Sequence, residues 1–327
     1  MARRSPPGEF ELIARFARPA PRSGAGVALG IGDDAAVLRL PRGRDLVATV
    51  DAVVEGVHFD GRFAPEDVGW KALAVSLSDL AAMGARPLWA LCALAAPGSA
   101  DPGRLARAGR GLAACARRFG VALAGGNLTR AACLSLTVTA LGAVRPGRAL
   151  RRAGARPGDL LVVSGALGGA AWGRRRGAPP EAVRRQRRPE PRLALGRALA
   201  GVASACIDLS DGLLQDLGHL CRASGVGAEV WLSDLPLAAG LPEAARGRAD
   251  LEALALGGGE DYELLAAVPP GRLDRALALS RRLRVPLQVA GIVTAGRGAV
   301  ARGLGGERLR PRSGGWDHLA RVPRTAP

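Results

Sequence analysis

Apolar and polar positions along the first half of the chain repeat with two different periods. Residues 65–83 carry apolar side chains at the spacing of one helix face, which predicts an amphipathic helix. Residues 104–119 predict a second helix, whereas residues 46–50 and 134–144 have the pattern of strands. Helices that alternate with strands are typical of an α/β or α+β domain.

A stretch rich in glycine, proline and arginine at residues 145–158 interrupts this periodicity and is the best candidate for a domain boundary. The second half restarts with a strand at residues 160–163. Further helices are predicted at residues 212–223 and 273–283, and further strands at residues 262–268 and 287–292. The expected organisation is an α/β N-terminal domain, residues 1–147, and an α+β C-terminal domain, residues 148–327.

Composition places the chain among soluble globular proteins. Its 327 residues are 48% hydrophobic, which is sufficient for one large domain or two ordinary domains, each with its own core. Apolar stretches fall short of the roughly 18 residues that a membrane span needs. The N-terminal segment carries Glu9 and Glu11 and lacks the apolar core of a signal peptide. Five scattered cysteines without a C-x-x-C pair suit reduced thiols. We therefore expect a cytoplasmic protein that does not contact a membrane.

A formal net charge of +17 raises the possibility of nucleic-acid binding. The composition argues against it, because Lys71 is the only lysine and the positive charge is almost entirely arginine in a chain rich in alanine, glycine and proline. Aromatic residues make up only 3% of the chain and offer few platforms for stacked bases. We expect no nucleic-acid partner.

Aspartates at the ends of apolar segments are the most informative chemical feature. One such residue alone is more often a turn former or a helix cap than a ligand. A whole set of carboxylates without neighbouring cysteine or histidine clusters suits a hard cation such as Mg²⁺. The chain has no G-x-x-x-x-G-K-[ST] loop and no protein-kinase motifs, so metal ions would have to stabilise phosphate charge. The set comprises Asp33, Asp34, Asp51, Asp79, Asp208 and Asp211.

Several long motifs, in order and over nearly the whole chain, resemble the thiamine-monophosphate kinase family. In the first half they are residues 8–13 (GEFELI), 30–36 (GIGDDAA), 56–59 (GVHF) and 71–85 (KALAVSLSDLAAMGA). In the second half they are residues 207–213 (IDLSDGL), 258–264 (GGEDYEL) and 315–318 (GWDH).

The resemblance implies the two-domain fold of aminoimidazole-ribonucleotide synthetase and selenophosphate synthetase, with a homodimer formed by the first domain. It also implies ATP as co-substrate, several Mg²⁺ ions and direct in-line transfer to thiamine monophosphate, with no catalytic nucleophile. The implied Mg²⁺ ligands are Asp34, Thr49, Asp51, Asp79, Asn127, Asp208 and Asp211. ATP contacts would come from Gly126, Asn127, Arg152 and Ser210, and thiamine contacts from His58, Glu260 and Trp316.

These roles agree with the chemistry, since phosphoryl transfer mainly requires aligned anions with neutralised charge, and an indole ring can lie against cationic thiamine. Structural alternatives stay open: His58 as a hydrogen-bonded core histidine and Trp316 as an anchor on the core. Lys71 is open between a phosphate contact and a structural ion pair.

The chain departs from the family pattern at three positions, one of which is Arg187, where a histidine is common. Asn127 stands where the family has a metal-binding aspartate, and Val50 replaces a hydroxyl residue. A neutral amide should weaken metal binding. Two other functions therefore remain: a related ATP-dependent enzyme with another acceptor, and a catalytically weakened nucleotide sensor.

Overall fold

The chain folds into two compact units. The computed structural model describes residues 9–19, 26–31, 35–303, 305–309 and 315–316. The first unit consists of residues 1–151 and 187–201, and the second of residues 152–186 and 202–327. Residues 187–201 thus return to the first unit after residues 152–186, which belong to the second.

Residues 187–201 belong to the first unit because they pack closely against one of its helices. Gly196 on helix α6 (Leu193–Leu199) lies so close to helix α2 (Pro65–Ala82) that an added Cβ would come within 1.9 Å of the Ala81 carbonyl oxygen. The indole Nε1 of Trp70 donates a hydrogen bond of 3.0 Å to the carbonyl of Pro189. Local periodicity carries no information on such contacts between distant segments.

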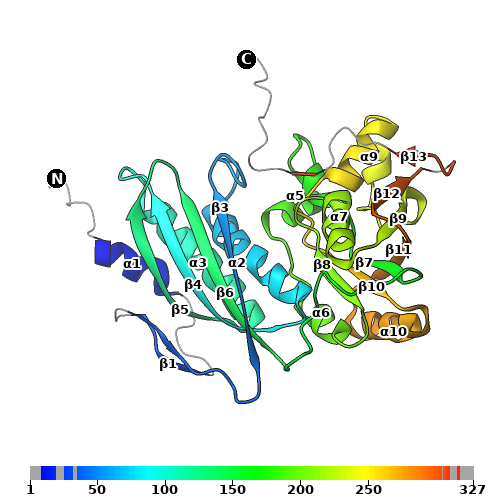
Figure 1. The fold of residues 1–327 in the computed structure, drawn as a ribbon. Coiled ribbons are helices and arrows are strands. Elements are labelled where there is room, and N and C mark those ends of the chain that lie inside the picture. Colours follow the sequence, from blue (N-terminus) through cyan, green and yellow to red (C-terminus); the bar gives the residue numbers. More distant parts are fainter. Residues whose placement is uncertain (1–8, 20–25, 32–34, 304, 310–314, 317–327) are drawn as a thin grey trace. The chain divides into compact units, whose positions relative to one another are not determined.

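The first unit is built on a four-stranded sheet of order β3-β6-β4-β5. Strands β4 and β5 are parallel and are joined by α3, and the other pairs are antiparallel. Figure 1 shows α2 and α3 together on one face of this sheet. Besides α2 and α6, the elements are α1 (Glu9–Ala17), β1 (Val27–Leu29), β2 (Val37–Leu38), β3 (Asp45–Val54), β4 (Arg86–Ala96), α3 (Pro102–Phe119), β5 (Ala122–Arg130) and β6 (Ser135–Val144).

Sequence signals fix the ends and the packing of α3. The Asp101 carboxylate caps its N-terminus by accepting the N–H groups of Gly103 and Arg104, each at 3.0 Å. Gly120 ends it in the left-handed conformation. On α2, Gly69 allows the two helices to approach, since a Cβ there would lie 1.8 Å from the Ala108 carbonyl oxygen.

The second unit contains a seven-stranded sheet of order β13-β12-β9-β11-β7-β10-β8, in which all neighbours are antiparallel except β12 and β9. Its core is a continuous cluster of buried side chains from the sheet and α7, such as Val163, Ile207 and Leu217. The elements are β7 (Leu160–Ser164), α4 (Gly169–Gly173), α5 (Pro180–Arg187), β8 (Ala205–Asp208), α7 (Leu213–Ser224), β9 (Gly227–Trp231), η1 (Leu232–Asp234), α8 (Leu241–Ala244), α9 (Arg248–Gly257), β10 (Leu264–Val268), η2 (Pro270–Arg272), α10 (Leu273–Leu283), β11 (Leu287–Thr294), β12 (Gly298–Arg302) and β13 (Arg308–Leu309).

The long helices predicted from periodicity are all present, at α2, α3, α7 and α10. The strand predicted at residues 46–50 continues to Val54, so that Asp51 lies within strand β3 and not at its end. Among the described residues, no helix combines the length and the hydropathy needed to cross a membrane.

Candidate active site

Three of the predicted metal ligands meet in the first unit. Thr49 and Asp51 lie two residues apart on β3, and their side chains therefore point to the same face of the sheet. This is the face covered by α2, which carries Asp79. The Thr49 hydroxyl donates a hydrogen bond to the Asp79 carboxylate, and Asp51 is also hydrogen-bonded to Asp79. A strand and a helix thus bring three oxygen-bearing side chains together.

The pair of carboxylates is electrostatically strained. The pKa of Asp51 is raised from 3.8 to about 7, mainly by burial and also by the charge of Asp79 and a hydrogen bond with it, while a hydrogen bond from Ser76 lowers it. Asp51 Oδ2 is buried without a hydrogen-bond partner. An unpaired buried carboxylate oxygen beside a second carboxylate and a hydroxyl fits a hard divalent cation, because every donor is oxygen. The residues present therefore suit Mg²⁺.

Asp34, another predicted metal ligand, lies outside the described residues together with Asp33.

Asn127 and Gly126 lie on β5, at the opposite edge of the same sheet. Strand pairing aligns Asp51 with Val138, Cys92 and Gly126 in one row, so Asn127 belongs to the next row and points to the other face. Three strand spacings of about 4.8 Å separate the two edges by about 14 Å. Within this unit, Asn127 and Asp51 therefore lie on opposite edges of the sheet, with side chains on opposite faces.

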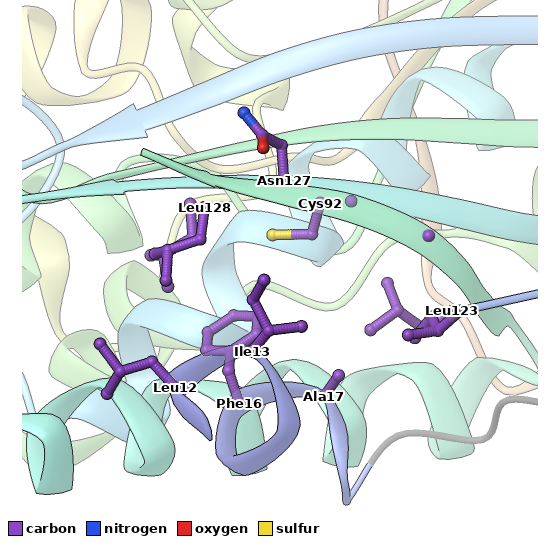
Figure 2. A pocket seen from close by; sticks show the side chains of 12 residues that line it. Leu12, Ile13, Phe16, Ala17, Cys92, Leu123, Asn127 and Leu128 are labelled. Carbon is purple, nitrogen blue, oxygen red and sulfur yellow. The ribbon is translucent and has the colours of Figure 1, made fainter. Parts of the chain in front are cut away.

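A small apolar cavity lies beneath β5. It has a volume of about 70 Å³, and its lining includes Ile13, Phe16, Cys92 and Leu123. Figure 2 shows these side chains between α1 and the sheet, whereas the side chain of Asn127 points away from them. None of the described residues that line the cavity carries a charged group for a phosphate or a metal ion.

His58 lies on the turn that follows β3. Its Nδ1 accepts a hydrogen bond of 3.1 Å from the backbone N–H of Val54, which leaves the proton of the neutral ring on Nε2. Lys71 is fully buried, donates a hydrogen bond of 3.0 Å from Nζ to the His58 carbonyl and lies 5.5 Å from the centre of the Phe63 ring. The only lysine of the chain thus supports the turn that carries His58.

In the second unit, the predicted ligands follow strand β8. Asp208 is the buried last residue of β8, and Ser210 and Asp211 lie in the loop before α7. The carboxylate of Asp216, in the first turn of α7, accepts backbone hydrogen bonds from Asp211 at 3.1 Å, from Gly212 at 3.2 Å and from Ser210. This buried side chain fixes the backbone of the loop.

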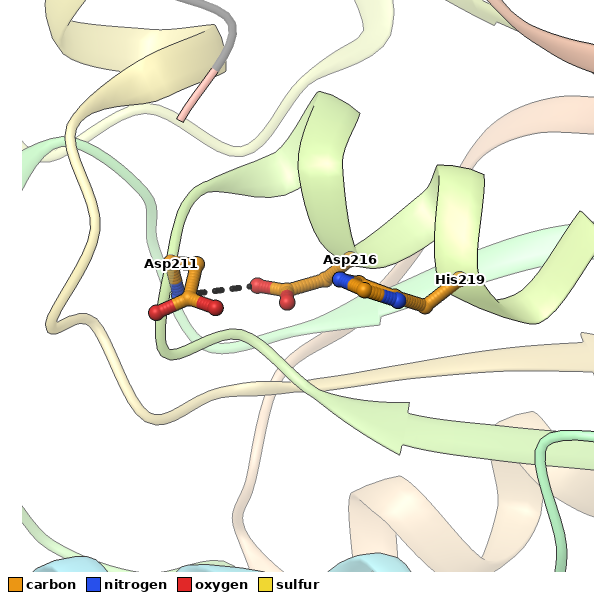
Figure 3. A group of neighbouring side chains, drawn as sticks. All are labelled: Asp211, Asp216 and His219. Atoms are coloured by element: carbon orange, nitrogen blue, oxygen red, sulfur yellow. Dashed lines mark hydrogen bonds between the residues drawn. The ribbon is translucent and has the colours of Figure 1, made fainter. Parts of the chain in front are cut away.

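The same region brings a second acidic pair close together. Ligand atoms of Asp211, Asp216 and His219 lie within 4.8 Å of one another (Figure 3). Burial raises the pKa of Asp216 to about 7, and the charge of Asp211 contributes to this. Burial lowers the pKa of His219, as do the nearby charges of Arg222 and of Arg152, one of the predicted ATP contacts.

Two predicted thiamine contacts are attached to this loop through their backbones. The N–H of Glu260 donates to the Ser210 carbonyl at 2.7 Å, and the N–H of Trp316 donates to the Asp211 carbonyl at 3.0 Å. Glu260 has φ of 63°, a conformation that is unusual for a residue with a side chain, and its carboxylate pairs with Arg174 at 3.1 Å. The structure therefore brings Ser210, Asp211, Glu260 and Trp316 together.

Reasoning from the sequence assigned no ligand-binding or loop-positioning role to Asp216 or Gln215 and left the role of Lys71 open. A carboxylate four residues after a glycine that precedes a helix was a weak signal for Asp216, because such a side chain can reach the free N–H groups at the helix start. The burial of Lys71 had no local signal.

Comparison with known proteins identifies the class. The family AIR synthase related protein, N-terminal domain, matches residues 32–144, and AIR synthase related protein, C-terminal domain, matches residues 156–303. A structure of Escherichia coli HypE, a hydrogenase maturation protein, has a TM-score of 0.74 over 94% of this chain and 98% of that chain at 22% identity, which is a likeness of fold alone. The fold is thus that of the AIR synthase related proteins, as expected.

Nearer relatives narrow the class to one family. Thiamine-monophosphate kinase of Escherichia coli K12 is 40% identical over 96% of this chain and 98% of the relative. The crystal structure of thiamine-monophosphate kinase from Stenotrophomonas maltophilia is 41% identical, with a TM-score of 0.80, over 89% of this chain and 94% of that chain. AaThiL complexed with AMPPCP and TMP is 30% identical, with a TM-score of 0.75, over 97% and 100%. The chain belongs to the thiamine-monophosphate kinase family.

Proposed function

We propose that the protein transfers the γ-phosphoryl group of ATP to the phosphate of thiamine monophosphate, which yields thiamine diphosphate and ADP. A phosphate oxygen of the acceptor forms the new bond to the γ-phosphorus as the bond to the β,γ-bridging oxygen breaks. The observation that carries the proposal is the buried, unpartnered oxygen of Asp51 beside Asp79 and Thr49, in a chain 40% identical to a thiamine-monophosphate kinase over 96% of its length. No side chain is required as a nucleophile.

In the first unit, Thr49, Asp51 and Asp79 are the proposed Mg²⁺ ligands, together with Asp34. Bound Mg²⁺ would neutralise phosphate charge and align the ATP phosphates. Thr49 and Asp51 hold their oxygens on a strand and Asp79 holds its oxygens on a helix, so that the geometry of these three exists before the ligands arrive. His58, with its Nε2 proton as a donor, is a proposed contact for the substrate.

In the second unit, Asp208 and Asp211 are proposed Mg²⁺ ligands, and Ser210 and Arg152 are proposed ATP contacts. Glu260 and Trp316 would contact the thiamine moiety. Trp316 is 44% exposed, and its indole is the proposed contact surface for the cationic thiazolium. Their backbone hydrogen bonds to the Ser210–Asp211 loop support a shared role.

Gly126 and Asn127 on β5 are proposed ATP contacts, and the Asn127 side chain lies on the sheet face that α2 and α3 leave uncovered. We assign Asn127 to a different cation from the one that Asp51 and Asp79 would hold, since about three strand spacings separate them. Its neutral amide oxygen offers one weak ligand.

The test is an assay of purified protein with ATP, Mg²⁺ and thiamine monophosphate. Thiamine diphosphate, separated by chromatography, should appear in equal amount with ADP and only when Mg²⁺ is present. The Asp51→Asn variant serves as the inactive control. The absence of thiamine diphosphate after incubation with ATP, Mg²⁺ and thiamine monophosphate would refute the proposal.

A panel of acceptors separates the two other functions named above. Thiamine monophosphate should be preferred over unphosphorylated thiamine and over unrelated phosphate monoesters. Faster transfer to another acceptor would indicate a related enzyme of the same fold, and nucleotide binding without turnover would indicate a sensor.

The proposed enzyme is a cytoplasmic homodimer that pairs through its first unit. Val50 and Leu46 on β3 are 60% and 52% exposed, on the sheet face that α2 and α3 leave uncovered. Light scattering should report twice the chain mass of 33.5 kDa, and Val50→Asp should shift the mass toward one chain. A fully active wild-type monomer would count against pairing.

A further inference from the structure

Gln215 connects two residues to which different ligands have been assigned. It lies in the first turn of α7, and its side-chain Nε2 donates hydrogen bonds to Asp211 Oδ2 at 3.2 Å and to the Trp316 carbonyl at 2.7 Å. A side-chain amide has two N–H hydrogens, so these two bonds use its full donor capacity.

Trp316 is attached to Asp211 by a further hydrogen bond. Its backbone N–H donates to the Asp211 carbonyl at 3.0 Å. Gly315 lies against Gln215 as well, because a Cβ at Gly315 would come within 2.2 Å of Gln215 Oε1. Gln215 and the Asp211 carbonyl therefore hold the backbone of Trp316 beside Asp211.

We propose that Gln215 is a positioning residue that couples divalent-cation binding at Asp211 to the placement of Trp316, and so to the binding of the aromatic, cationic substrate. The inference rests on the roles proposed above for Asp211 and Trp316. A cation that reorients the Asp211 carboxylate changes the bond to Gln215, and the same amide transmits the change to the Trp316 backbone. Because linkage is reciprocal, the substrate at Trp316 also favours the cation.

The discriminating variant is Gln215→Met, which keeps the length of the side chain but removes both donors. The matched control is Gln288→Met, because Gln288 also donates from Nε2 to a backbone carbonyl, that of Asp234 at 2.7 Å, away from the site. Circular dichroism and thermal unfolding establish that both variants are folded.

The first readout needs neither substrate nor activity. Trp316 emission is isolated as the difference between each protein and its Trp316→Phe derivative, and MgCl₂ is titrated into both. Wild type and Gln288→Met should show a Mg²⁺-dependent change in this difference, and Gln215→Met should lose most of it. An unchanged response in Gln215→Met, or no response in wild type, would overturn the coupling.

The second readout is calorimetric binding of thiamine monophosphate to metal-free protein. Gln215→Met should bind about 3- to 10-fold more weakly, the range expected for one or two partly exposed hydrogen bonds. In a Trp316→Ala background, the same substitution should have no further effect. Additive losses would mean that Gln215 acts independently of Trp316. If the wild-type protein produces no thiamine diphosphate, the proposed function is refuted instead. The fluorescence titration does not depend on that assay, so the two failures can be distinguished.

Discussion

The two groups of acidic residues are held in opposite ways. In the first unit, Asp51 and Asp79 lie on regular elements and face each other, and one buried oxygen has no partner. In the second unit, Asp211 lies on a loop. The backbone N–H groups of this loop donate hydrogen bonds to the Asp216 carboxylate, and the Asp211 carboxylate accepts one from Gln215. Burying the neighbouring carboxylates of the first unit lowers the stability of the fold, whereas the hydrogen bonds in the second unit stabilise a loop. Mutations in the two groups should therefore separate activity from stability.

Asp51→Asn and Asp79→Asn should have the largest effect on activity. Each removes one charge from the proposed cation site, and one charge at close range is worth about 4 kcal/mol at an effective dielectric of about 20, so transfer should fall by roughly 100-fold or more. Thermal unfolding of the metal-free variants should be unchanged or shifted upward. Asp45→Asn, an exposed change on the same strand, is the control. Near-normal turnover at limiting Mg²⁺ would contradict the assignment.

Asp216→Ala should reduce both activity and stability. It leaves the loop N–H groups without their acceptor, which should cost about 1 to 3 kcal/mol in the free energy of unfolding. Loss of loop geometry should lower turnover by about 10-fold or more, since misplacement of a ligand by a fraction of an ångström is costly. Urea denaturation and the kinase assay measure both effects. Asp216→Asn retains an acceptor and should lose less free energy of unfolding than Asp216→Ala. Equal losses of stability in the two variants would argue that Asp216 does not fix the loop.

The pH dependence of stability should differ between wild type and Asp51→Asn in the absence of metal. Because the folded-state pKa of Asp51 is raised from 3.8 to about 7, the folded protein binds this proton more tightly than the unfolded chain. Its contribution to stability is fully present below pH 3.8 and is lost as the pH rises through 7. Between pH 5 and pH 8, the free energy of unfolding of Asp51→Asn should therefore rise relative to that of wild type, by on the order of 2 kcal/mol. Parallel stability curves would show that the carboxylates are not crowded.

Lys71→Met tests the support of His58. The variant keeps most of the buried volume but removes the donor to the His58 carbonyl. The KM for thiamine monophosphate should rise by about 3- to 10-fold, with a smaller change in kcat, because a displaced turn weakens a binding contact more than the transfer step. Lys71→Arg should recover part of the loss. A change confined to kcat would favour a direct phosphate contact instead.

Asn127→Asp should have the smallest effect. The residue is exposed and lies about 14 Å from the Asp51 edge of the sheet, beyond the screening length of roughly 8 Å at physiological salt. The Mg²⁺ concentration for half-maximal activity should shift by less than about 2-fold. A 10-fold shift would mean that Asn127 faces the same cation as Asp51.

Much of the fold was predictable because its signals are local. The helix periodicity of residues 65–83 and 273–283 predicted α2 and α10. The return of residues 187–201 was not predictable, since Gly196 and Pro189 contact α2 over more than one hundred positions. The chemistry of the site was visible as aspartates, but the residues that orient them were not.

The sequence by itself determined the family, the oxygen-rich character of the site and the elements that carry its residues, because motif order and side-chain chemistry are written along the chain. Only the tertiary structure decided which of these residues meet. The register of β3, β6, β4 and β5 separated Asn127 from Asp51, and the packing of α2 buried Lys71 under His58. The link from Gln215 to Trp316 joins positions 101 residues apart. Such pairings arise from sheet register and close packing, which depend on the whole fold and leave no periodic signal in any one segment.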